Sequence, residues 1–177
     1  MPEGLGAEGL GAEDLGAGDL VAHARRLADT IRYLTVATVD ADGRPWSTPV
    51  YFAADDRLEC FYWMSAETSQ HSRNIASNAA VSLAVFDSTV PPYHGRCLYA
   101  SGRAEIVVGD ELAHALGVYP GTAERGGSAV TQADVSGESP WRLYRVRASE
   151  LWVLCPRAPR QPCQRHGRAD DHRARVR

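Results

Sequence analysis

The stretches YLTVATVDADGRPWSTPVYF (33–52), LECFYWMSAETSQHSRNIASNAAVSLAVFD (58–87) and LYASGRAEIV (98–107) decide the fold of this chain. They contain short runs rich in Val, Tyr, Phe, Trp and Thr, separated by turn signals such as DADG and ADDR. Such runs are typical of strands joined by hairpins, so we expect a meander. The predicted strands cover 33–39, 44–53, 58–65, 81–87 and 96–108.

The segment WRLYRVRASELWVLCP (141–156) supplies the last strands, around residues 143–146 and 151–154. Gly102 can permit a bulge in the long strand that contains it. Three short helices are expected: 19–31 with Asp19 as N-cap, 66–78 with Ser65 or Thr68 as N-cap, and 110–119. Six or more strands with sparse helices predict a mainly β fold, a small antiparallel barrel.

A chain of 177 residues fits one domain flanked by two unusual ends. The leucines of EGLGA-EGLGA-EDLGA-GDLVA recur every five residues, so they share no face of a helix. Residues 1–18 are therefore predicted to be disordered. Residues 19–156 form the barrel domain. Residues 157–177 form a tail with seven arginines and two aspartates. We weigh nucleic acid contact for this tail, but it lacks aromatic residues. We therefore expect a solvated end that can close with a short strand at 172–176.

Composition narrows the class of protein. The chain is 44% hydrophobic and 23% charged, as in ordinary globular domains, and it has no apolar run long enough for a membrane helix. The first twenty residues lack the pattern of a signal peptide, which favours the cytoplasm. All nineteen basic residues are arginine. Covalent pyridoxal-phosphate catalysis is thus excluded, and phosphate recognition must use Arg, His, hydroxyl or backbone N–H groups.

The four cysteines form no CxxC pair, and we interpret them as buried free thiols. The tail contains four residues of the types that bind metals, namely His166, His172, Asp170 and Asp171. Nothing apolar in the tail is expected to hold them in a binding geometry, so no metal site is predicted.

The richest polar cluster, Ser65–Asn74, follows a strand and opens a helix. A helix start offers unpaired N–H groups and a favourable dipole, so hydroxyls and cations there suit a phosphate. The alternative is an ordinary capped helix with a polar face. In the predicted strand 44–53, Pro49 is expected to interrupt pairing and free backbone groups for a flat ring system. Trp63 and Trp141 are expected to border the same slot.

In these stretches the chain resembles the pyridoxamine 5′-phosphate oxidase-like family of FMN-binding split barrels, over roughly residues 20–155. The resemblance implies a six- to eight-stranded split barrel and a cytoplasmic homodimer with flavin between the subunits. The FMN phosphate would then lie at Gln70 and His71, with Ser65, Ser69 and Ser72 close by, and Arg73 would add positive charge if it turned inward. The ring edge would lie along Thr48, Pro49 and Val50, with Cys97 and Trp141 contributed across the interface.

The resemblance implies an FMN-dependent oxidoreductase that transfers hydride between flavin and a small organic substrate. Gln70-His71 replaces the family's usual Lys/Arg pair, and the segment 141–157 lacks the arginine–histidine motif of true pyridoxamine-phosphate oxidases. That activity is therefore not implied. A deazaflavin coenzyme, and a non-catalytic flavin- or haem-binding module, remain alternatives. No residue stands out as a catalytic acid or base; Tyr93 and His94 are weak candidates for lining the substrate side.

A homodimer is also expected on physical grounds. A barrel of this size is filled by its own side chains, so a tricyclic ring must lie outside it, and covering both faces takes a second subunit. The aromatic residues exceed what one small core readily buries. Those we expect to be in surplus are Trp46, Tyr51, Tyr62, Trp63, Tyr99 and Trp141.

Overall fold

The computed structural model describes residues 20–177, so the predictions for residues 1–18 and for Asp19 lie outside it. Strands and short helices alternate along the chain much as the sequence predicts. In chain order they are α1 (Leu20–Thr30), β1 (Tyr33–Val39), β2 (Pro45–Tyr51), β3 (Ala53–Ala54), β4 (Cys60–Ala66), α2 (Gln70–Ser77), β5 (Ala80–Phe86), β6 (Cys97–Ile106), α3 (Asp110–Val118), the 3-10 turns Ala123–Arg125 and Gln132–Val135, β7 (Trp141–Leu154) and β8 (Arg173–Arg175).

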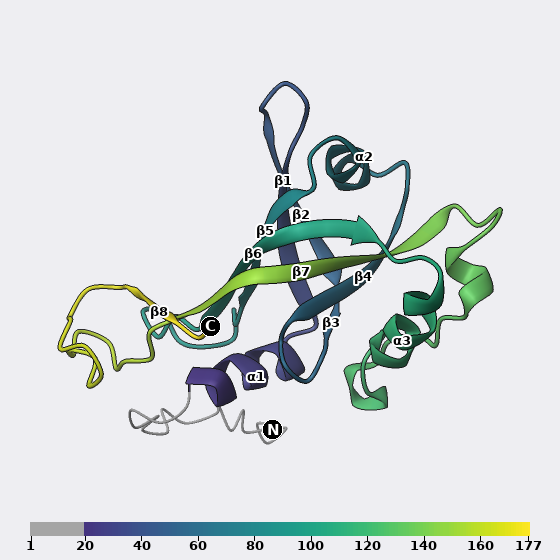
Figure 1. The fold of residues 1–177 in the computed structure, drawn as a ribbon. Helices are drawn as coiled ribbons and strands as arrows, with labels where there is room; N and C mark the ends of the chain where they lie inside the picture. The colour runs from purple at the N-terminus through teal and green to yellow at the C-terminus, as the bar shows by residue number, and fades with distance from the viewer. Residues whose placement is uncertain (1–19) are drawn as a thin grey trace, which may run out of the picture.

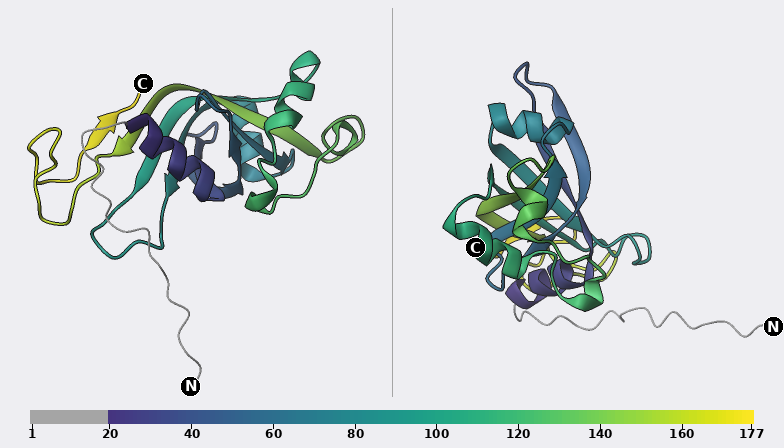
Figure 2. Two further views of the ribbon diagram at one scale, coloured as in Figure 1. Left: turned by 90° about the horizontal axis from the view of Figure 1, so that it is seen from below. Right: turned by 90° about the vertical axis from the view of Figure 1, so that its right-hand side faces the viewer.

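The strands form one curled antiparallel sheet, which confirms the predicted split barrel (Figure 1). Its order is β2-β1-β5-β6-β7-β4-β3, with β8 paired to β7. Figures 1 and 2 show α1 and α2 at opposite ends of this sheet and α3 on its outer side. Among the helices of residues 20–177, none is long and apolar enough to cross a membrane.

The expected hairpin between strands 44–53 and 58–65 forms only next to its turn, where β3 pairs with β4, and β4 otherwise pairs with β7 rather than with β2. The cause lies at Phe52, which is fully buried between β2 and β3. Its N–H donates to the carbonyl of Arg32, and its own carbonyl accepts from Arg125 at 2.6 Å. The N–H bond continues the register of β1 with β2, but the carbonyl is bound outside the ladder, so the pairing with β1 ends at Phe52 and the chain passes to the other edge of the sheet.

Strand β4 is buried on both of its faces, which explains its almost continuous apolar sequence. Phe61 and Trp63 point into the barrel core. Cys60 and Tyr62 point outward into a second apolar cluster, which includes Leu112 of α3. The strand therefore holds α3 on the barrel, and its end delivers Ser65 to the start of α2.

The two strands predicted around residues 143–146 and 151–154 belong to a single strand, since β7 runs without a break for 14 residues. It pairs with β4, β6 and β8. The register of β6 against β7 shifts between Ser101 and Gly102, which confirms the bulge expected there. A side chain at position 102 would collide with the backbone of Arg147, so glycine is required at this close approach.

Helix α1 packs Ala24 and Leu27 against the barrel and carries a buried histidine that the sequence analysis did not single out. His23 is 4% exposed, and its Nε2 has no hydrogen-bond partner among the described residues. Burial, reinforced by the charges of Arg26 and Arg96, lowers its pKa to about 4. The folded chain therefore holds this imidazole in its neutral form over most of the pH range.

We expect His23 to make folding sensitive to mild acid. Its folded pKa lies below its unfolded value of 6.5, so the unfolded chain takes up the proton first as the pH falls. Stability should be unaffected by this group above pH 6.5 and decline between 6.5 and about 4, by up to about 3 kcal/mol. Urea unfolding of the wild type and of His23→Leu across this range measures the difference. Parallel curves for the two proteins would contradict the prediction.

Candidate site at the start of α2

The turn between β4 and α2 is built by hydroxyl groups. Ser69 is the N-cap of α2, in place of the expected Ser65 or Thr68, and its Oγ accepts from the N–H of Ser72 at 3.4 Å. The same Oγ donates to the Ser72 hydroxyl at 2.8 Å. A cap of this kind fixes the first turn and leaves the remaining N–H groups of that turn directed along the helix axis.

His71 lies behind this turn rather than on its open side. It is 4% exposed, and its Nε2 lies 2.8 Å from the Oγ of Ser65 and 3.2 Å from that of Ser69. Burial lowers its pKa, which favours the neutral ring. His71 thus holds the two serines in place and supplies no positive charge, contrary to the role expected for it at the phosphate.

Arg73 is the exposed cation of the first turn of α2. Its guanidinium donates to the backbone carbonyl of Thr68, and to Oε1 of Gln70 at 2.8 Å. Gln70 in turn donates to Asn74 at 2.8 Å, and Asn74 donates to the hydroxyl of Thr38 on β1 at 2.9 Å. The arginine is therefore drawn back over the helix start, where it can meet an anion together with the free N–H groups.

Strand β2 lies at one edge of the sheet and pairs only with β1 among the described strands. The expected interruption at Pro49 is wrong, because this residue pairs with Thr35 inside a continuous strand. An edge strand tolerates proline, since a missing N–H on its outer side costs no ladder bond. Thr48 is half-buried, Pro49 exposed and Val50 buried, so the outer edge near Thr48 and Pro49 is the accessible part.

The structure places Trp63 away from any ligand surface, which corrects its predicted role beside the slot. Its side chain is 0% exposed and stacks on Tyr144 inside the barrel, with ring centroids 5.5 Å apart. The alternation of β4 puts Trp63 on the same face as Phe61, toward the core. A residue enclosed in this way cannot touch a ring that lies outside the barrel.

Trp141 and Cys97 are far apart within one chain. Trp141 begins β7, pairs with Ala66 and is 45% exposed, so it stands beside the β4–α2 turn. Cys97 begins β6, next to the other end of β7, and is buried. Cys97 therefore cannot join this site within one chain. With Trp63 also excluded, the predicted residues that remain lie on β2, at Ser65 of β4, in and before α2, and at Trp141 of β7.

A cleft of about 660 Å³ lies elsewhere, between α1, the β3–β4 turn and α3. Arg25, Asp29, Asp55 and His114 are among its lining residues. None of the residues predicted from the sequence to bind a cofactor lines it. The two weak candidates for the substrate side lie in neither place, since Tyr93 and His94 belong to the loop between β5 and β6.

The structure brings His166 and His172 together with two cysteines, whereas the sequence analysis weighed these histidines with Asp170 and Asp171 and predicted no metal site. Cys155, Cys163, His166 and His172 have ligand atoms that all lie within 4.8 Å of one another. The expectation of a solvated tail is wrong here, because Cys163 is 1% exposed and Ala174 of β8 is 3% exposed, both within the core cluster. The C-x-x-H spacing of residues 163 and 166 is the local signal, but its partners come from distant positions.

Comparison with known proteins supports this architecture. A crystal structure of Atu2129 from Agrobacterium tumefaciens, of unknown function, is 22% identical with a TM-score of 0.61, covering 78% of this chain and 57% of that chain. A heme binding protein from Mycobacterium smegmatis is 20% identical with a TM-score of 0.61, covering 85% and 56%. The present chain thus spans little more than half of either structure, and at these identities the likeness concerns the fold alone.

An F420 reductase is 27% identical with a TM-score of 0.52, covering 72% of this chain and 94% of that chain. No curated protein sequence matches the chain. Residues 20–155, by contrast, match the family described as pyridoxamine 5′-phosphate oxidase, and this stretch includes every strand of the barrel except β8. The chain therefore belongs to the pyridoxamine 5′-phosphate oxidase family.

Proposed function

We propose that this chain is an FMN-dependent oxidoreductase that transfers hydride between the flavin and a small organic substrate. The observation that carries the proposal is the juxtaposition of the first turn of α2 with the open edge of β2 at one end of the barrel. The two are linked through β1, since Asn74 of α2 donates to the hydroxyl of Thr38, which lies opposite Trp46 of β2. Anion-binding and ring-binding surfaces are thereby adjacent.

The residues present at the start of α2 fit a phosphate. The N–H groups of its first turn and the helix dipole favour an anion, and the Ser69 hydroxyl and the Arg73 guanidinium stand at the same point. Ser65, His71 and Ser72 are buried beneath and hold this turn in shape. In a chain without lysine, Arg73 is the cation best placed to meet the phosphate.

The ring would lie along the outer edge of β2, where Thr48 and Pro49 are accessible. Backbone groups on an unpaired edge can hydrogen-bond the polar rim of a flat heterocycle. When bound, a flavin accepts or donates a hydride, and the protein's part is to bind it, orient it and exclude water. We assign no acid or base among the side chains at this site.

We further propose that the protein acts as a homodimer, because one subunit covers only one side of such a ring. The predicted aromatic surplus needs correction, since Tyr62 and Trp63 are 1% and 0% exposed in the core. Trp46 and Trp141 remain 49% and 45% exposed near the α2 end. Aromatic residues of this kind are enriched at interfaces, and a second subunit would also bring its own Cys97 to the site.

A deazaflavin coenzyme is the second candidate, favoured by the 27% identity to an F420 reductase. The similarity to a heme binding protein keeps a non-catalytic haem- or flavin-binding module as a third outcome. The cysteines are free thiols, as expected in a reducing compartment. We therefore propose that the protein is cytoplasmic.

The absorption spectrum of the purified full-length chain, with the mass of any ligand released on denaturation, tests the proposal. We expect a flavin spectrum and the mass of FMN, or saturable FMN binding by ligand-free protein. A deazaflavin mass would select the second candidate, and a haem spectrum the third. Protein that binds none of these three would overturn all of them.

Light scattering at micromolar concentration should give a dimer. A monomer holding one flavin per chain would refute the interface.

Replacing Arg73 with alanine is expected to weaken FMN binding about tenfold, because one charge-assisted hydrogen bond to the phosphate is lost. Fluorescence titration of FMN measures the change. Arg26→Ala, at another exposed arginine on a helix, is the matched control and should leave the affinity unaltered. Equal FMN affinity in Arg73→Ala and Arg26→Ala would place the phosphate elsewhere.

A further inference from the structure

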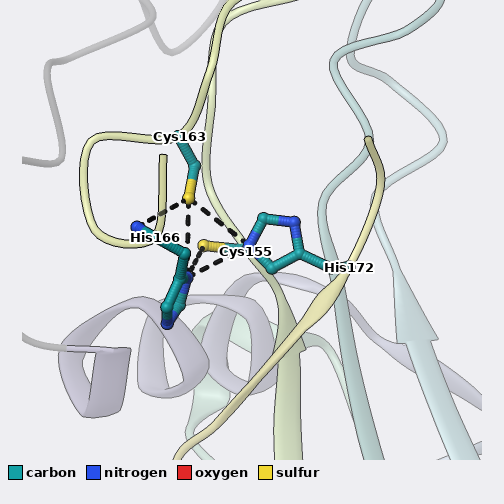
Figure 3. Close-up of side chains that lie close together, drawn as sticks. All are labelled: Cys155, Cys163, His166 and His172. Carbon is teal, nitrogen blue, oxygen red and sulfur yellow. Dashed lines mark hydrogen bonds between the residues drawn. The ribbon is translucent and has the colours of Figure 1, made fainter. Parts of the chain in front are cut away.

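Two cysteines and two histidines converge where the C-terminal segment returns to the barrel (Figure 3). Cys155 follows the last residue of β7, and His172 precedes the first residue of β8. Cys163 and His166 come from the turn between them, and the four side chains point toward one another in Figure 3. The pairing of β8 with β7 brings the two ends of this 155–172 loop together, with the Cys155 N–H donating to the His172 carbonyl at 2.9 Å.

The spacing of the ligand atoms is that of a tetrahedral zinc site. Zinc bonds of about 2.3 Å to sulfur and 2.0–2.1 Å to nitrogen place sulfur and nitrogen ligands about 3.6 Å apart and two nitrogens about 3.3 Å apart. Here Nδ1 of His166 lies 3.5 Å from the sulfur of Cys155 and 3.5 Å from that of Cys163. Nε2 of His172 lies 3.3 Å from the Cys163 sulfur and 3.1 Å from Nδ1 of His166.

One of the two rings and one of the two thiols have supporting hydrogen bonds from the backbone around the cluster. Nδ1 of His172 lies 2.8 Å from the carbonyl oxygen of Asp170, which fixes a proton there and leaves Nε2 as a lone-pair donor. This outer hydrogen bond is the arrangement that orients metal-bound histidines. The N–H of His166 donates to the sulfur of Cys163 at 3.1 Å, as expected where a backbone turn supports a thiolate.

The turn that carries two of the ligands is tight and has the residue types it needs. The N–H of Gly167 donates to the Cys163 carbonyl at 2.8 Å, and Gly167 has φ +65°, a conformation that favours glycine. The C-x-x-H spacing followed by glycine thus folds Cys163 and His166 to one side.

We propose that Cys155, Cys163, His166 and His172 bind one Zn²⁺ ion as a structural site. Two thiolates and two neutral imidazoles give a neutral complex with a divalent cation, so the half-buried position needs no further counter-charge. Four protein ligands fill the tetrahedral shell and leave no position for water or substrate, which is the mark of a structural rather than a catalytic zinc.

The zinc would fasten the C-terminal arm (residues 156–177) to the barrel. Beyond the site, Arg173 lies over the ring of Tyr99 at 4.4 Å, and Arg177 donates to the carbonyls of Leu58 and Ala148 at 3.3 and 3.0 Å. The arm is also held by the pairing of β8 with β7 and by the buried side chain of Ala174. The site lies at the end of the barrel opposite the start of α2 (Figure 1). The proposed metal therefore serves the fold of the arm, independently of any cofactor.

The experiment is metal analysis of the full-length chain purified under reducing conditions from zinc-supplemented medium. We expect one zinc per chain in the wild type and in Cys60→Ser, a matched control at a buried cysteine outside the cluster. Cys163→Ser should lose the metal. Replacement of zinc by Co²⁺ should give thiolate-to-cobalt charge transfer and the intense visible bands of a tetrahedral site.

Because Cys163→Ser could fail to fold, the wild type is also tested by chelation. Removal of zinc should lower the melting temperature by several degrees, and stoichiometric Zn²⁺ should restore it. The proposal is overturned if reduced wild-type protein holds no zinc and gives no tetrahedral cobalt spectrum. It is equally overturned if Cys155 and Cys163 are joined in a disulfide under these conditions, or if folded Cys163→Ser retains a full complement of zinc.

Discussion

Replacing Arg125 with alanine is expected to lower the free energy of unfolding by about 3 kcal/mol, among the largest losses for a single change in this chain. The guanidinium is 9% exposed and donates to four backbone carbonyls. The acceptors are Ala28, Asp29, Ile31 and Phe52, at distances of 2.6 to 3.1 Å. Their loss would leave the end of α1 and the β2–β3 junction without donors.

The position of the charge adds to this effect. Carbonyls at a helix C-terminus carry partial negative charge, so a cation there is favourable. The ring of Phe52 lies 5.1 Å from the guanidinium carbon, which adds a cation–π contact. Arg125→Lys should recover only part of the loss, because an ammonium cannot reach four carbonyls in a planar fork.

Urea unfolding measures this prediction, with Arg26→Ala on the exposed face of α1 as the control. The control should stay within about 0.5 kcal/mol of the wild type. A loss below about 1 kcal/mol for Arg125→Ala would mean that water replaces the guanidinium at all four carbonyls.

Trp63→Ala should cost about 3–5 kcal/mol, the range for removing a large aromatic side chain from a packed core. Trp63 is among the largest fully buried side chains and stacks on Tyr144 at an interplanar angle of 12°. Its indole N–H has no hydrogen-bond partner among the described residues. Trp63→Phe should therefore be milder, since it removes an unpaired donor along with part of the volume.

The Trp63→Phe variant also separates the core from the cofactor site. With Trp63 enclosed in the barrel, FMN affinity should stay within about twofold of the wild type despite the lower stability. Thermal unfolding and fluorescence titration on the same sample measure both quantities. A large loss of FMN binding in folded Trp63→Phe would show that the tryptophan reaches the ring after all.

The strands and short helices could be predicted because their signals are local. Alternation and turn residues around 33–52 and 58–87 mark each strand, and Gly102 marks the bulge. Pairing order is not local: that β4 lies beside β7 depends on Phe52 and on Arg125, residues 73 positions apart. A proline that interrupts a strand and a proline that is accommodated in an edge strand look the same in the sequence. The expected interruption of the strand at Pro49 was wrong for this reason.

Around the start of α2, the predicted helix is confirmed, while the expected orientations of two side chains are wrong. The hydroxyl-rich segment correctly indicates a capped helix start, but sequence alone does not say which side chains face inward. His71 and Trp63 are both turned into the protein, one toward Ser65 and one toward Tyr144. The sequence analysis weighed His166 and His172 for a metal without Cys155 and Cys163, because Cys155 and His172 meet only when β8 pairs with β7.

The junction at Phe52 limits how the barrel can move. Strands β2 and β3 lie at the two ends of the sheet order, yet a single residue separates them in the chain. Two residue steps span at most about 7 Å, so the end of β2 at Tyr51 and the start of β3 at Ala53 must stay close together. This connection acts at one point, and the rest of β2, back to Pro45, has an outer edge that is unpaired among the described strands. Any opening of the sheet between these two edges would therefore pivot at Phe52 and be widest at the Pro45 end of β2.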